Sequence, residues 1–194
     1  MSNTNVLNKN YTAFKLSAKT STLVIMLAIA LAVLLPQLAH TAGAAIGINS
    51  LLGEVILPMH FPVMLTGFIA GPVAGAITGL FAPIISFMLT GMPGTAMLPF
   101  IIIELAIYGL TSGAIKNTNI HMVAKIFAVQ LSGRLARAIA ILATFYLVGN
   151  ERVKPAIILE SIKTGAIGIV LQLTLIPLIM IAVGKVINNE QSSK

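Results

Sequence analysis

Residues 61–89 read FPVMLTGFIAGPVAGAITGLFAPIISFML and contain no charged side chain. As one continuous helix this stretch would be about 45 Å long, whereas the hydrocarbon core of a bilayer is roughly 30 Å thick. Gly71-Pro72 lies near its first third. Proline disfavours helix in the residue before it and removes a backbone N–H. The stretch therefore predicts two short membrane-spanning helices, about 59–70 and 72–90, joined by a tight turn.

The composition of the whole chain also indicates a membrane protein. Of its 194 residues, 57% are hydrophobic and only 9% are charged, and the mean hydropathy is +0.99. Soluble domains carry about 25% charged residues, whereas a charge near the centre of a bilayer costs several kcal/mol. We predict one all-α integral membrane domain over residues 1–194, with a polar N-terminal segment at 1–19 and a polar tail at 188–194.

Four further apolar stretches bring the predicted number of transmembrane helices to six. Turn-forming or charged residues separate them, notably a loop of small residues at 39–57 and a charged loop that reaches Glu160. The remaining predicted spans are 23–38, 96–115, 123–148 and 162–187. The alternative for the first span is a secretory signal peptide cleaved near residues 39–42. Its length, and Pro36 within its last turn, favour a transmembrane helix.

The basic residues predict the orientation of these helices. With six spans and a cytoplasmic N-terminus, the first and third loops face outside and contain no Lys or Arg. Seven lysines then lie on the cytoplasmic side: Lys9, Lys15, Lys19, Lys116, Lys125, Lys185 and Lys194. Only Arg152, Lys154 and Lys163 lie near the outer face. The positive-inside rule therefore favours cytoplasmic N and C termini.

Several ionisable or polar residues fall inside the predicted spans, where such a residue indicates a functional site. Glu104 and Tyr108 lie one turn apart in the fourth span, and Arg134 and Arg137 share one face of the fifth. Glu104 and Arg137 would lie at similar depths, so an ion pair between them is the simplest structural explanation. One arginine would then lack a carboxylate partner, and facing a cavity it would suit a substrate carboxylate or phosphate.

Other candidates are polar residues near the outer face or in the middle of a span. Gln172 is central in the sixth span, and His60 begins the second. A single histidine there is more often a cap or interface residue than a metal ligand. Asn49 and Glu54 lie in the first outer loop, as solvated polar residues or as part of a lid over a ligand.

Small residues recur at four-residue spacing, which lets two helices approach closely in a membrane. Ala28 and Ala32 have this spacing in the first span, and so do Gly71, Gly75 and Gly79 in the third. Packing within the chain explains both sets most simply.

The sequence excludes most catalytic sites. There is no Cys and no Asp, so thiolate metal sites, disulfides and Asp-based triads are absent. No P-loop, HExxH or GxSxG motif occurs. The basic residues are not clustered with aromatic residues, as nucleic-acid binding would require. We expect a protein that is not an enzyme, with no metal site and no nucleic-acid partner.

Residues 57–113 carry a set of motifs: His60-Phe61-Pro62, Gly71-Pro72, Gly91-Met92-Pro93, Glu104 and Tyr108-Gly109. This set resembles the substrate-binding S component of energy-coupling factor (ECF) vitamin transporters. Chain length, six spans and the basic N-terminal segment agree, so the resemblance covers nearly the whole chain. It implies a bacterial cell-membrane subunit that captures a vitamin from outside. Its partners would be a transmembrane coupling subunit and two cytoplasmic ATPases that use ATP, with no cofactor in this chain.

The resemblance also assigns roles to residues. Family members pack an Ala-x-x-x-Ala pattern of the first helix on the coupling subunit, which here falls on Ala28 and Ala32. They bind ligand near the outer face, between helices four to six and the first, third and fifth loops. The resemblance thus implies ligand binding by Glu104, Tyr108, Arg137 and Gln172, with Asn49, Glu54 and Met92 as loop contacts. From the residue analysis we add His60 and Arg134 as candidate ligand-binding residues.

The motif pattern is most similar to S components assigned to pantothenate, cobalamin and pyridoxine-like compounds. Unpaired arginine charge favours an anion, hence pantothenate, and the chain lacks the aromatic cluster expected for a flavin. Two other hypotheses remain. A stand-alone secondary carrier would use Glu104 for proton coupling, and a membrane enzyme or assembly factor would need a reactive constellation that the sequence does not show.

Overall fold

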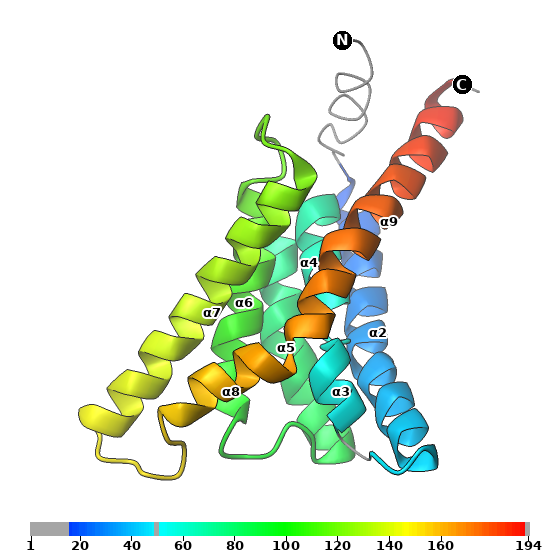
Figure 1. The fold of residues 1–194 in the computed structure, drawn as a ribbon. Coiled ribbons are helices and arrows are strands. Elements are labelled where there is room, and N and C mark those ends of the chain that lie inside the picture. The colour runs from blue at the N-terminus through cyan, green and yellow to red at the C-terminus, as the bar shows by residue number, and fades with distance from the viewer. Residues whose placement is uncertain (1–15, 49–50, 193–194) are drawn as a thin grey trace.

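The computed structural model describes residues 16–48 and 51–192, with the side chains of residues 186–192 excepted. All regular secondary structure within these ranges is helical. The helices are α2 (Ala18–Ala45), α3 (Leu51–Ile56), α4 (His60–Ala70), α5 (Pro72–Thr90), α6 (Leu98–Ala114), α7 (Met122–Tyr146), α8 (Ala156–Thr164) and α9 (Ala166–Ser192). Figure 1 shows the long helices side by side as one bundle.

Five segments in the described ranges are long and apolar enough to cross a membrane: Ala18–Ala45, Leu51–Ala70, Pro72–Thr90, Met122–Tyr146 and Ala166–Lys185. The fourth predicted span, 96–115, corresponds to α6, which has 17 residues and is about 25 Å long. The chain is therefore an all-α, multi-pass membrane protein. The number of six spans stays a prediction.

The break at Gly71-Pro72 lies where the sequence predicts it. Gly71 separates α4 from α5 with a φ of 97°, a backbone conformation that residues with a Cβ rarely adopt. Pro72 then begins α5, where its missing N–H costs no helical hydrogen bond. This residue pair turns the uncharged stretch 61–89 back on itself.

The most extensive helix contact joins α5 to α6, and glycines make it possible. A Cβ atom added at Gly75 would collide with the carbonyl oxygen of Gly109, and one at Gly79 with that of Leu105. The two backbones therefore touch directly, as small residues permit in membrane helices. The predicted packing role of Gly75 and Gly79 within the chain is confirmed, whereas Gly71 belongs to the turn.

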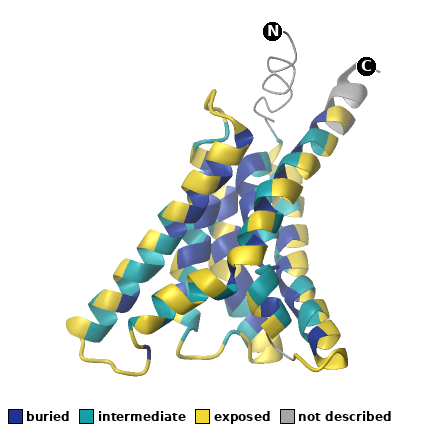
Figure 2. Cartoon of the chain, in the orientation of Figure 1, coloured by how far each residue is buried: buried dark blue, intermediate teal, exposed yellow. Residues whose placement is uncertain are grey.

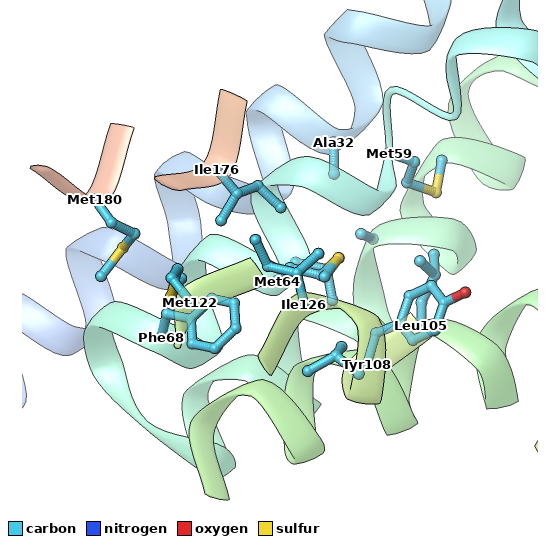
Figure 3. Packing of buried hydrophobic residues seen from close by; sticks show 13 residues of the cluster. Ala32, Met59, Met64, Phe68, Leu105, Tyr108, Met122, Ile126, Ile176 and Met180 are labelled. Carbon is cyan, nitrogen blue, oxygen red and sulfur yellow. The ribbon is translucent and has the colours of Figure 1, made fainter. Parts of the chain in front are cut away.

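A buried apolar cluster fills the middle of the bundle (Figure 3). It draws side chains from α2, α4, α5, α6, α7 and α9 and includes Met64, Tyr108, Ile126 and Ile176. Figure 2 shows the complementary pattern, with exposed residues along the outer sides of the long helices. Many of these exposed side chains are large and apolar. Such a surface suits contact with lipid chains.

Ala28 and Ala32 belong to the inside of the bundle and not to its surface. Their exposed fractions are 7% and 0%, and Ala32 is part of the central cluster. The exposed side of α2 carries Leu27, Leu31 and Leu34 instead. The two alanines therefore pack within the chain in this structure, and a docking role for this helix stays a prediction.

Several predicted boundaries are wrong, and two predicted loops contain helix. The first helix runs from residue 18 to residue 45 rather than from 23 to 38, and Pro36 lies within it. The predicted loop at 39–57 thus contains the end of α2 and the short helix α3, and the predicted charged loop before residue 160 contains the start of α8. The turn signal at Gly43 is overridden, because glycine costs only about 1 kcal/mol inside a helix.

The start of α2, the end of α9 and the turn between α6 and α7 lie at one end of the bundle (Figure 1). Two lysine side chains at this end donate hydrogen bonds to backbone carbonyl groups. The Lys116 Nζ atom donates to the carbonyl oxygen of Ile69 at 3.3 Å, and the Lys125 Nζ atom donates to that of Lys116 at 2.8 Å. Burial lowers the pKa of Lys116. The predicted cytoplasmic location of this end remains a prediction.

Candidate functional site

A cavity of about 380 Å³ opens at the other end of the bundle. Side chains from α2 to α8 line it, together with the segment that joins α5 to α6. Its polar or charged lining residues are His40, Glu54, His60, Ser86, Glu104, Arg134, Arg137, Glu160, Ser161 and Thr164. Met59, Met92, Met97, Ile101 and Ile157 supply much of its apolar surface. This size and mixed lining are typical of sites for small molecules.

Glu104 lies at the inner wall of the cavity and is only 1% exposed. Its Oε2 atom accepts a hydrogen bond from the Nη1 atom of Arg137 at 2.9 Å, which confirms the predicted ion pair. Its Oε1 atom accepts one from the Tyr108 hydroxyl at 3.0 Å. A buried carboxylate requires such partners. Glu104 therefore joins α6 to α7 at the base of the cavity.

His60 stands beside this group. Its Nε2 atom lies 3.9 Å from Oε1 of Glu104, and its ring centroid lies 5.3 Å from that of Tyr108. Within the described ranges, neither ring nitrogen of His60 has a hydrogen-bond partner, although the side chain is buried. The His60 ring can therefore donate to, or accept from, a molecule in the cavity.

Arg134 lies one turn before Arg137 on α7, in different surroundings. No carboxylate of the described residues lies within 4.0 Å of its guanidinium group. Its Nε atom is buried without a hydrogen-bond partner in the same ranges. Gly165, between α8 and α9, leaves room for it, because a Cβ atom there would lie 3.3 Å from the Arg134 Nη2 atom.

Tyr108 and Gln172 do not line the cavity. Tyr108 is 1% exposed and contacts Gly133 of α7 through its ring. Gln172 accepts a hydrogen bond from Gln130 at 3.1 Å, so that pair connects α7 to α9 in the interior. Neither residue is part of the cavity lining, and Tyr108 supports the site from behind through its hydrogen bond to Glu104.

Glu54 and Met92, both predicted to lie in loops, do line the cavity as exposed residues, although Glu54 belongs to the short helix α3. Asn49, the third predicted loop contact, lies outside the described residues. Sequence reasoning missed Ser86, His40, Glu160 and Ser161. Ser86 was missed because Ser and Thr in apolar helices usually bond to their own backbone, as Thr66 and Thr78 do here.

Unpartnered polar atoms converge on this cavity. Most buried side-chain nitrogens and oxygens that lack a hydrogen-bond partner in the described ranges belong to five lining residues: His40, His60, Ser86, Arg134 and Arg137. Buried polar atoms are satisfied in more than about 90% of cases. Their concentration in one place indicates a site for a polar molecule. No group of three or more metal-ligating side chains suited to a metal ion occurs among the residues described.

Comparison of the chain with models of known protein families, with curated proteins and with solved structures finds no match. The resemblance to ECF S components therefore rests on the sequence motifs alone.

Proposed function

We propose that this chain is the substrate-binding S component of an ECF-type importer, which captures a water-soluble vitamin in the cavity between α2 and α8. The observation that carries the proposal is the convergence of unpartnered buried polar atoms on one cavity at one end of a membrane bundle. A polar molecule in this cavity would satisfy these atoms, as expected for a binding subunit.

The size of the cavity narrows the choice among vitamins. Pantothenate and pyridoxine-like compounds fit a volume of about 380 Å³, whereas a corrinoid such as cobalamin is far too large to be enclosed by it. Three glutamates and two arginines line the cavity, but only Glu104 of the glutamates is deeply buried, so the inner end beside both arginines favours an anion. Pantothenate is therefore the first candidate, and a pyridoxine-like compound is the alternative.

Transport requires partners in this proposal. A transmembrane coupling subunit and two cytoplasmic ATPases supply the energy of ATP, and this chain supplies the specificity. Because Ala28 and Ala32 are buried, the coupling subunit contacts other parts of the chain. The exposed apolar side of α2 is one such surface, since partner subunits and lipid chains both suit it.

The first test is native mass spectrometry of the protein purified from cells grown in rich medium. A bound mass equal to that of a B vitamin supports the proposal. Added vitamin at 100 times its Kd would stabilise the protein by about 2.7 kcal/mol, which thermal unfolding detects. An unliganded spectrum, with no vitamin raising the melting temperature, would overturn the proposal. Uptake without any ATPase subunit would favour a stand-alone carrier instead.

A matched pair of variants on α8 tests the location of the site. Ser161 lines the cavity, so Ser161→Phe should fill it and abolish vitamin binding. Leu159 is 65% exposed on the same helix and does not line the cavity, so Leu159→Phe should bind as the wild type does. Equal binding by both variants would place the vitamin elsewhere.

A further inference from the structure

The two arginines of the cavity differ in how their charge is compensated. The Arg137 guanidinium forms the 2.9 Å ion pair with Glu104, whose second oxygen is taken by the Tyr108 hydroxyl. The charge of Arg137 is thus compensated by Glu104 within the protein. Arg134 has no carboxylate within 4.0 Å among the residues described, and Glu104 is already engaged. The net charge of these three side chains is therefore positive, and Arg134 is the arginine without a direct ion pair.

The position of Arg134 suits an anion that enters from water. A buried cation is costly unless it is paired, and the Arg134 Nε atom is enclosed without a hydrogen-bond partner in the described ranges. A guanidinium group matches a carboxylate through two parallel hydrogen bonds. The missing side chain at Gly165 keeps space beside the Arg134 Nη2 atom.

A different helix presents an uncharged polar group to the same cavity. Ser86 of α5 is 1% exposed, lines the cavity, and has no partner for its hydroxyl oxygen within the described ranges. Helix α6 packs against both α5 and α7, so Ser86 and Arg134 line the cavity from two different neighbours of α6. A ligand that satisfies both must carry its anionic group and a neutral hydrogen-bonding group at separate positions.

The mouth of the cavity disfavours additional negative charge. Glu54 of α3 and Glu160 of α8 both line the cavity and are exposed. Like charges brought close together repel, so a second anionic group on the ligand would be unfavourable near these carboxylates.

From these features we infer that the cavity selects a monocarboxylate: its carboxylate binds Arg134, and a neutral hydroxyl or amide group at another position binds near Ser86. The inference rests on the proposed function, since it concerns the ligand of the same cavity. It makes Arg134 the specificity-determining residue and leaves Arg137 to hold Glu104 and α6.

Matched pairs of compounds test this selectivity on the purified full-length chain. Each pair differs in one charge: pantothenate and panthenol, nicotinate and nicotinamide, biotin and biotinamide. For any pair that binds, the acid should bind at least about tenfold more tightly than its neutral analogue, as expected for a charge-assisted hydrogen bond. Isothermal titration calorimetry measures both dissociation constants.

Variants then assign the preference to one side chain. Arg134→Gln should abolish the preference for the acid, because it should weaken binding of the acid far more than binding of the neutral analogue, and Arg134→Lys should retain part of the preference. Arg152→Gln is the matched control, because Arg152 lines a different, smaller cavity and its loss should not change the preference. Without ligand, Arg134→Gln should be at least as stable as the wild type, since Arg134 forms no ion pair within 4.0 Å in the part described and an unpaired buried cation is costly.

The outcomes separate the two proposals. If no compound binds and no vitamin is carried through purification, the proposed function fails and this inference fails with it. If a neutral vitamin such as pyridoxine binds as tightly as any acid, the monocarboxylate inference fails and the proposed function stands. The same conclusion follows if Arg134→Gln weakens both members of a pair equally.

Discussion

The α5–α6 interface and the cavity between α2 and α8 are packed in opposite ways, the first tightly and the second openly. At the interface, Gly75 and Gly109 bring two backbones into contact, and no added side chain fits. At the cavity, large polar side chains such as Arg134 and His60 stand apart and retain unpartnered atoms. Close backbone packing holds α5 and α6 together, and both of these helices contribute residues to the cavity.

The largest expected effect is on the glycine interface. Gly75→Leu should prevent folding, because its side chain would have to occupy the position of the Gly109 carbonyl group. Overpacking typically costs 1–3 kcal/mol, and a collision with backbone that cannot yield should cost at least about 3 kcal/mol. Size-exclusion chromatography and circular dichroism in detergent measure the loss. Gly94→Leu is the control, since nothing lies within 4 Å of a Cβ atom at Gly94.

The next effect concerns the ion pair at the base of the cavity. Glu104→Gln should destabilise the protein by about 3 kcal/mol, because it leaves Arg137 partly buried without its carboxylate. Adding Arg137→Gln to that variant should cost much less than Arg137→Gln does alone, since the two side chains act as a pair. Thermal unfolding of the two single variants and the double variant measures this. Strictly additive losses would contradict the pairing.

The smallest expected effect concerns the buried and exposed sides of α2. Ala32→Leu should cost about 2 kcal/mol by overpacking the central cluster, in which Ala32 is 0% exposed. Ala30 lies two residues away on the exposed side of the helix, so Ala30→Leu should change stability by less than about 0.5 kcal/mol. Unfolding temperatures of the two variants decide the matter. A larger loss for Ala30→Leu would mean that the inward face of α2 is assigned incorrectly.

Much of the site could be anticipated from the sequence, for identifiable reasons. Glu104, Arg134 and Arg137 are costly in an apolar segment, so their presence alone marks a special place. Helical spacing put both arginines on one face of α7, and Arg137 meets Glu104 as predicted. Ser86 and His40 gave no such signal, because a single serine or histidine is common in helices that serve no site.

The all-α membrane architecture and the reversal of the chain at Gly71-Pro72 could be predicted from the sequence, because hydropathy and proline geometry act locally. Which side of each helix faces inward depends on the fold as a whole. In the folded chain Ala28 and Ala32 are buried in the bundle, and Tyr108 lies behind the cavity. The fold also determines that Glu104 forms its ion pair with Arg137 and not with Arg134. The physical reason is that burial and pairing depend on neighbours far apart in the chain, and residue spacing along one helix does not specify them.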